Sequence, residues 1–265
     1  MRMMCIASGS SGNCTYIGSD HTHILVDDGI SMKRVKEGLN QLELDPSDLS
    51  GIFITHEHSD HISGLRALLK KYQIPVYATA GTIAGILNSP KIDEVDPALF
   101  NVIARESNTP VGDLEVQSFR IYHDANEPCA YTVSDGCKKA GVLTDLGHYD
   151  DYIIQHMKGV NSLVLESNHD VHMVEVGPYP YYLKQRILGA NGHLSNESSG
   201  KLLDQLLHPD LSHIFLGHLS AHNNYEDLAF ETVRLEVNQS ESEYKAEDFR
   251  IQVARPDTPI AAVSF

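Results

Sequence analysis

The sequence lacks the features of a membrane protein and of a disulfide-stabilised secreted protein. No run approaches the roughly 18 apolar residues that a membrane span needs, and the N-terminus has no charged segment followed by a long apolar core. The four cysteines are scattered without a C-x-x-C pair, which argues against a disulfide framework and predicts free buried thiols. Tryptophan is absent, which excludes nothing. These absences predict a cytoplasmic protein with no membrane partner.

Positive charge is also scarce. Lys and Arg number 20 against 36 Asp and Glu, so the formal net charge is −16. Such a charge argues against a protein that coats nucleic acid by broad electrostatic attraction. Short basic groups occur, for example at Lys184 and Arg186. We expect them to be solvated surface rather than a path for phosphates.

The chain has the size and patterning of one layered domain. No Pro-, Gly- or Ser-rich linker divides the 265 residues, of which 42% are hydrophobic, so we expect a single domain over residues 1–265. Apolar runs of strand length recur between segments of helical periodicity near 32–42, 62–72, 82–88, 149–157, 180–188, 196–207 and 225–237. Helices separate some strands and hairpin-like turns, such as the one at Asp135-Gly136, separate others. The pattern predicts an α/β sandwich of two mixed sheets with helices outside.

Several of the predicted strands stop at a polar residue. The runs at 23–26, 51–54, 115–122, 140–144, 162–165 and 213–217 precede Asp27, Thr55-His56, His123, Asp145, Glu166 and His218 respectively. Strands that carry polar residues at their ends present them along one rim of a sheet. The rim of the predicted sandwich is therefore the expected place of a functional site.

The run from Thr55 to His61, T-H-E-H-S-D-H, places three imidazoles and the carboxylate of Asp60 within six consecutive positions. In an extended segment His56 and His58 point the same way, so they can bind one ion together. Asp60 and His61 then begin a helix and point at a second position. Imidazole with carboxylate suits Zn or Mn, so the run predicts two divalent metal ions.

Two metal ions need more ligands than this run supplies, and the strand ends supply His123, Asp145 and His218. In the predicted arrangement the first ion has His56, His58 and His123, the second has Asp60, His61 and His218, and Asp145 bridges them. Two ions about 3.5 to 4 Å apart lower the pKa of a shared water and position it as hydroxide to attack an ester. The predicted reaction is therefore hydrolysis, with phosphoesters and carboxylic esters both open.

Five further residues are candidates for supporting roles. Asp27 ends its strand beside the site and could orient a ligand imidazole, or it could only form a turn. The Gly-rich segment from Ser8 to Asn13 offers Ser11 and Asn13 to a substrate anion as a backbone nest, or it is a plain tight turn. His169 follows a strand in the orientation of the ligands, so we expect it to line the cleft and bind substrate. His193 lies just before a helix for which Ser195 is a plausible cap.

The order and spacing of these motifs resemble those of the metallo-β-lactamase superfamily, which implies its αββα four-layer sandwich. More specific strings extend over nearly the whole chain: S-G-S-S-G-N-C from Ser8, H-D-A-N-E-P from His123, E-S-N-H-D from Glu166, G-H-L-S-N from Gly192 and G-H-L-S-A-H-N-N from Gly217. These strings resemble the bacterial YycJ group, also called WalJ or VicX. One departure is Leu146, because many superfamily members have Thr or Ser after the bridging Asp.

The resemblance implies a metal-dependent nuclease that acts on DNA from 5′ ends. It also implies a link, through gene neighbourhood, to a two-component system that regulates the cell wall. A related nuclease branch has a similar His-Ser motif, which makes His193 a phosphate contact or proton donor. Asp60 and His193 are thus the catalytic candidates.

The leading hypothesis is a two-metal 5′-to-3′ DNA exonuclease in which a metal-bridging hydroxide attacks a terminal phosphodiester. An alternative is a small-molecule ester or thioester hydrolase of the same fold, which would suit the acidic net charge. A third hypothesis is a regulatory binding protein with a structural metal site. Such sites normally hold one ion and fill every position with protein ligands.

Overall fold

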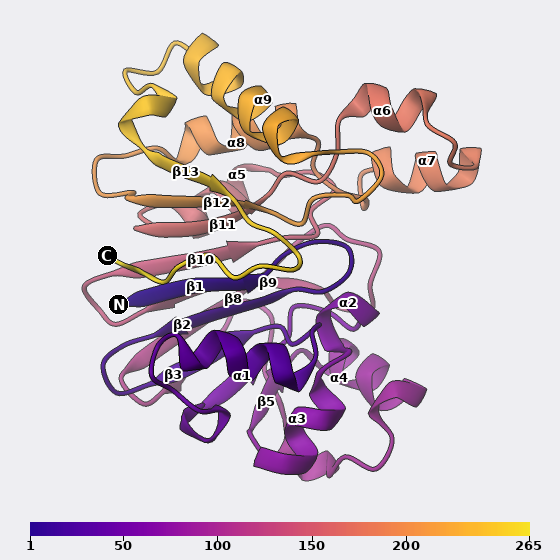
Figure 1. Ribbon diagram of the computed structural model, residues 1–265, viewed down its shortest axis with the longest axis vertical. Coiled ribbons are helices and arrows are strands. Elements are labelled where there is room, and N and C mark those ends of the chain that lie inside the picture. The colour runs from indigo at the N-terminus through magenta and orange to yellow at the C-terminus, as the bar shows by residue number, and fades with distance from the viewer.

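The apolar runs form two seven-stranded mixed sheets that pack face to face in the computed structural model of residues 1–265 (Figure 1). In spatial order the first sheet contains β14 (Val263–Ser264), β1 (Arg2–Ala7), β2 (Cys14–Gly18), β3 (His23–Val26), β4 (Gly51–Phe53), β5 (Val76–Ala78) and β6 (Phe100–Val102). The second contains β13 (Arg250–Val253), β12 (His213–Gly217), β11 (Ser162–Glu166), β10 (Lys139–Leu143), β9 (Cys129–Ser134), β8 (Leu114–Arg120) and β7 (Asn108–Val111).

Each sheet combines a parallel and an antiparallel part. In the first sheet β3 to β6 run parallel, and in the second β10 to β13 do so. The remaining neighbours are antiparallel, including β9 and β10, which the turn at Asp135-Gly136 joins as predicted. Within each parallel part the carboxyl ends of the strands share one edge, which is where open α/β sheets place their sites.

Helices cover the outer face of each sheet (Figure 1). The first sheet is covered by α1 (Met32–Asn40), α3 (Leu65–Tyr72) and α4 (Ala80–Leu87), and the second by α5 (Asp151–Met157), α8 (Asn196–Leu206) and α9 (Glu226–Gln239). The remaining helices are α2 (Ser59–Ile62), α6 (Val171–Val176), α7 (Tyr181–Leu188) and the 3₁₀ turns η1 (Pro46–Asp48), η2 (Pro90–Ile92), η3 (Pro97–Leu99) and η4 (Ala246–Asp248). The αββα sandwich predicted from the sequence is confirmed.

Three apolar clusters hold the layers together. Between the sheets lie Phe53, Tyr131 and Phe215, all fully buried. The rings of Phe53 and Tyr131 meet edge to face with centroids 5.4 Å apart, so the two sheets are joined by an aromatic pair. The outer clusters bury side chains such as Leu68 against the first sheet and Leu203 against the second.

The segment predicted as one helix over 62–72 is two helices, α2 and α3, separated at Gly64. At Gly64 the chain approaches the turn after β3 closely: its N–H donates to the Asp28 carbonyl at 2.8 Å. A Cβ here would lie 2.0 Å from the Ile30 carbonyl oxygen. The break therefore follows from a tertiary contact that helical periodicity does not reveal. Helix α6 was not predicted either.

Three of the four cysteines, Cys5, Cys14 and Cys129, are buried free thiols as expected. The expectation is wrong for Cys137, which is exposed. Cys137 lies in the hairpin turn between β9 and β10, where no second layer covers it. None of the helices combines the length and the apolar character needed to cross a membrane.

Candidate metal centre

The predicted ligands lie on the segments that follow the carboxyl ends of strands from both sheets. Asp27 follows β3, the H-x-H-x-D-H run follows β4, Asp145 follows β10 and His218 follows β12. Asp27, Asp145 and His218 have left-handed backbones, with φ of 62°, 59° and 57°. For a residue with a Cβ this conformation costs roughly 1–2 kcal/mol. Three such residues in one cluster indicate a functional site that the surrounding fold holds in place.

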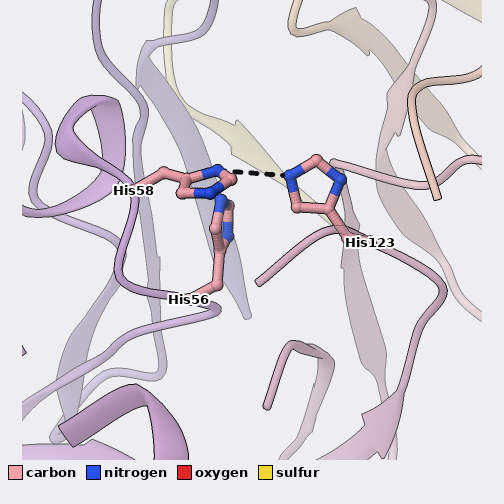
Figure 2. A group of neighbouring side chains, drawn as sticks. All are labelled: His56, His58 and His123. Carbon is pink, nitrogen blue, oxygen red and sulfur yellow. Dashed lines mark hydrogen bonds between the residues drawn. The ribbon is translucent and has the colours of Figure 1, made fainter. Parts of the chain in front are cut away.

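His56, His58 and His123 form the first group. Each offers a ring nitrogen, and these nitrogens lie within 4.8 Å of one another. Figure 2 shows the three rings turned toward a common point, with His58 Nδ1 and His123 Nε2 3.3 Å apart. His56 and His58 come from the extended segment after β4, as the alternation of side chains predicts.

Asp60, His61 and His218 form the second group. Asp60 Oδ2 lies 3.4 Å from His61 Nε2 and 3.3 Å from His218 Nε2. Asp60 and His61 belong to the four-residue helix α2, whose position is fixed by the break at Gly64.

Asp145 lies between the two groups. Its Oδ2 is 3.2 Å from His61 Nε2, and its Oδ1 is 3.5 Å from His218 Nε2 and 3.7 Å from His123 Nε2. Burial opposes ionisation of Asp145, but the charges of His218 and His61 outweigh it and hold the pKa of the carboxyl well below its usual range. The structure thus brings together all seven residues that the sequence grouped as metal ligands.

The second nitrogen of four of these imidazoles has a partner outside the cluster. Nδ1 of His56 lies 3.0 Å from Thr55 Oγ1, and Nδ1 of His61 lies 2.8 Å from Asp27 Oδ2. Nδ1 of His123 lies 3.1 Å from the Gly192 carbonyl oxygen, and Nδ1 of His218 lies 2.8 Å from Glu166 Oε1. Such partners set the tautomer and orientation of a metal-binding imidazole, and leave Nε2 as the ligating nitrogen.

Two buried atoms in the cluster have no hydrogen-bond partner: His56 Nε2 and Asp145 Oδ2. The second remains unpaired although His61 Nε2 is only 3.2 Å away. A buried polar atom without a partner is costly, and a cation satisfies both a ring nitrogen and a carboxylate oxygen. The residues present therefore fit a divalent metal, and together with the fold they indicate divalent metal binding.

Charge within the metal-free cluster is unevenly distributed. Burial and the neighbouring His61 lower the pKa of His56 well below its usual value. Burial also lowers the pKa of His61 and His218, but nearby carboxylates outweigh this effect and raise the pKa of both rings. Asp145 and Asp60 act on both, Asp27 acts on His61, and Glu166 acts on His218. Protons held by His61 and His218 compete with a metal ion, so metal binding releases protons and weakens in acid.

Glu166, the last residue of β11, is fully buried and was not among the predicted site residues. Its Oε1 accepts hydrogen bonds from Nδ1 of both His193 and His218 at 2.8 Å. Its Oε2 accepts from the backbone amides of Leu146 and Leu194 at 2.7 and 3.2 Å. Although burial opposes ionisation, His193 and His218 lower the pKa of Glu166 to about 2. The signal was present, because Glu166 ends an apolar run as Asp145 does.

Asp27 contacts a ligand imidazole, as expected. Besides its contact with His61, its Oδ1 accepts a hydrogen bond from the Thr55 backbone amide at 2.9 Å. Asp27 therefore ties the end of β3 to the start of the histidine run.

His193 and Asn13 lie beside the cluster. The ring of His193 is half-buried, with its centroid 5.2 Å from those of His123 and His218. Asn13 Nδ2 lies 3.4 Å from Asp60 Oδ2. Ser11 is exposed at the tip of the Gly-rich turn.

Two expectations about the cleft need correction. The Gly9 amide donates to Asn13 Oδ1 and the Gly12 amide to the Gly9 carbonyl, so two amides of the expected nest are used within the turn. His169 does not line an open cleft, because its side chain is only 1% exposed. The backbone of His169 pairs with that of Ser195 through an isolated parallel β-bridge.

Comparison with known proteins agrees with this geometry. Residues 22–211 match the family described as "Beta-lactamase superfamily domain". The chain is 40% identical over 237 residues to exodeoxyribonuclease YycJ of Bacillus anthracis, covering 88% of this chain and 86% of that protein. It is 36% identical over 253 residues to exodeoxyribonuclease WalJ of Streptococcus pneumoniae, covering 96% and 94%.

Among solved structures, the metallo-β-lactamase fold protein YhfI of Bacillus subtilis superposes with a TM-score of 0.70. The sequences are 14% identical, and the superposition covers 98% of each chain. At that identity the likeness shows a shared fold.

Proposed function

This chain belongs to the metallo-β-lactamase superfamily, and on that premise we propose that it is a metal-dependent exodeoxyribonuclease that removes nucleotides from the 5′ ends of DNA. The observation that carries the hydrolytic part is the position of Asp145, whose carboxylate lies 3.7 Å from His123 of the first group and 3.2 Å from His61 of the second. DNA as the substrate rests on the two relatives named exodeoxyribonucleases, which match most of the chain. The same relatives do not favour a small-molecule ester or thioester hydrolase.

We propose that the centre binds two divalent ions, Zn or Mn, and that Asp145 would be a ligand of both. The first would be held by His56, His58 and His123, and the second by Asp60, His61 and His218. When bound, such a pair supplies an activated water nucleophile at neutral pH and Lewis-acid stabilisation of charge on the reacting phosphate.

The other residues of the site would position the ligands and the substrate. Asp27 and Glu166 hold the rings of His61 and His218 through Nδ1. His193 is held in the same way by Glu166, which leaves its Nε2 for a phosphate oxygen or for donating a proton to the leaving oxygen. Such a proton donor needs no reorganisation at the moment of reaction, because its ring is already oriented.

The turn from Ser8 to Asn13 would contact the DNA backbone. Ser11 is exposed there, and Asn13 joins the turn to Asp60 through its side-chain amide. Residues 1–265 would act as one domain, since β14 near the C-terminus pairs with β1 at the N-terminus. A cytoplasmic location and a link to a two-component system stay predictions.

A cleavage assay on end-labelled duplex DNA tests this proposal. Protein loaded with Mn²⁺ or Zn²⁺ should release a 5′ label early and as a short product, whereas a 3′ label should persist on progressively shorter fragments. Substrates with 5′ phosphate and 5′ hydroxyl show which end is recognised. The double variant Asp60→Ala with His61→Ala should lose this activity, because it removes two of the three ligands of the second group.

The matched control is Asp20→Ala with His21→Ala, an adjacent Asp-His pair that is exposed in the turn between β2 and β3. This control should cleave DNA like the wild type. Intact DNA in the presence of fully metal-loaded wild-type protein would refute the nuclease proposal and return a small-molecule ester to consideration.

A further inference from the structure

Helices α6 and α7 form a hairpin that extends beyond the outer helices of the second sheet (Figure 1). Helix α7, of sequence Y-Y-L-K-Q-R-I-L, has no buried residue, and α6 buries only Val174. Tyr181 and Tyr182 are 76% and 73% exposed. A helix this short is only marginally stable by itself in water, and the apolar side chains of α7 do not pack into the core. Exposed apolar surface of this kind marks an interaction site.

The hairpin is anchored to the rim of the metal centre. The backbone N–H of His193 donates to the carbonyl oxygen of Ile187 in α7 at 3.1 Å. The Arg186 guanidinium forms an ion pair with Asp124, the residue that follows His123. The hairpin is therefore attached directly beside the candidate centre.

The surface of the hairpin combines aromatic rings with positive charge. A groove of about 330 Å³ is lined by Glu175, Tyr179, Tyr181, Lys184, Gln185 and Leu188. Arg186 is paired with Asp124, so the positive charge that the hairpin offers is that of Lys184, whose Nζ also donates to the Glu175 carbonyl oxygen at 2.7 Å. Rings on which bases stack, together with basic groups that follow the phosphates, are the two elements of single-strand recognition.

We propose that the α6–α7 hairpin binds single-stranded DNA, through base stacking on Tyr179, Tyr181 and Tyr182 and through phosphate contact with Lys184. It holds the strand whose end lies at the metal centre. The inference rests on the proposed nuclease function and specifies how the strand that enters the metal centre is held. Stacking also explains how an acidic protein binds DNA, because the contact needs no broad positive surface. Lys184, expected from the sequence to be only solvated, acquires a role.

The test measures affinity for a fluorescent oligothymidylate by anisotropy in the presence of chelator, and KM and kcat for the same oligonucleotide with metal. Replacing both exposed rings, Tyr181→Ala with Tyr182→Ala, should raise Kd and KM about tenfold or more, because each stacked base loses its platform. The conservative pair Tyr181→Phe with Tyr182→Phe keeps the rings and should stay within about threefold of the wild type. The control Leu235→Ala removes an exposed apolar side chain from α9 and should bind like the wild type.

The alternative occupants give different results. If the alanine pair binds and cleaves like the wild type while the wild type degrades DNA, the hairpin proposal is wrong and the nuclease proposal stands. If sedimentation shows a wild-type dimer that the alanine pair turns into a monomer with unchanged Kd for DNA, the surface is a self-association face and the proposal is also overturned. Wild-type protein that neither binds nor cleaves DNA overturns both proposals.

Discussion

Glu166 accepts hydrogen bonds from two imidazoles that flank Asp145, so one buried carboxylate orients His193 and His218 together. A carboxylate behind an imidazole raises the basicity of the nitrogen on the other side of the ring. Both oxygens of Glu166 accept hydrogen bonds, because the backbone amides of Leu146 and Leu194 donate to Oε2. Many superfamily members have a Thr or Ser hydroxyl at the position of Leu146. Glu166 needs no hydrogen bond from such a hydroxyl, because the backbone amide of Leu146 already donates to it.

Replacing Glu166 with Gln should weaken metal binding by about 10- to 100-fold, because the amide carries no charge to match the two imidazoles. Titration of metal into chelator-treated protein measures the effect. The exposed Glu241→Gln is the matched control and should keep wild-type affinity. Equal affinity in Glu166→Gln and the control would show that this carboxylate does not tune the centre.

Asp28 is a second buried carboxylate that the sequence did not single out. Both of its oxygens lack hydrogen-bond partners. Burial and the charge of Asp27 raise the pKa of Asp28 to about 8, whereas an Asp in an unfolded chain has a pKa of about 4. Between these values the folded protein holds a proton that the unfolded chain has released. The free energy of unfolding therefore falls as the pH rises through this window.

The variant Asp28→Asn removes this titration. Its free energy of unfolding, relative to wild type, should increase between about pH 4 and pH 8 with a slope near 1.4 kcal/mol per pH unit. Denaturant unfolding of chelator-treated protein at several pH values measures the difference. The exposed Asp20→Asn should give a difference near zero throughout. A flat difference for Asp28→Asn would mean that the carboxyl is ionised in the fold at neutral pH.

At the scale of elements, the strands that carry the site could be predicted because each is an apolar run that stops at a polar residue. β3 and β12 have the predicted bounds, and β8, β10 and β11 lie within two residues of them. The short edge strands β6 and β14 were not predicted, since two or three residues give no period. The break between α2 and α3 escaped prediction because its cause is the turn after β3, more than thirty residues earlier.

Gly64→Ala tests that contact. The added Cβ would lie 2.0 Å from the Ile30 carbonyl oxygen and 2.4 Å from Asp28 Oδ1, so α2 must move and carry Asp60 and His61 with it. We expect a loss of roughly 1–3 kcal/mol in the free energy of unfolding, and weaker metal binding.

Gly136→Ala is the comparison for Gly64→Ala. Gly136 has a positive φ of 88° and nothing within 4 Å of an added Cβ, so this variant should lose stability through backbone strain alone. Its metal affinity should not change. Unchanged metal affinity in Gly64→Ala would contradict the proposed coupling between the break and the site.

At the scale of the whole molecule, the candidate ligands join the two sheets. His56, His58, Asp60 and His61 follow a strand of the first sheet, whereas His123, Asp145 and His218 follow strands of the second. A metal ion held by both sets would link the two halves of the sandwich. Its binding free energy would then stabilise the whole fold rather than one loop.

Metal should therefore raise the thermal midpoint Tm of unfolding. At a free metal concentration of 100 times Kd the stabilisation is about 2.7 kcal/mol, which corresponds to a rise of several degrees for a chain of this size. Scanning calorimetry with and without chelator measures it. Asp60→Ala with His61→Ala should lose most of the rise, and Asp20→Ala with His21→Ala should keep it. Loss of the rise in the second variant would point to metal bound elsewhere.

We propose that the cluster around Asp145 is a two-metal centre that hydrolyses DNA. The most direct test titrates Mn²⁺ or Zn²⁺ into chelator-treated protein, and follows bound metal per chain and nucleotide release from a 5′-labelled strand in the same samples. Release should rise with occupancy and reach its maximum at two ions per chain. Two bound ions with intact DNA, or full activity in chelator, would contradict this proposal.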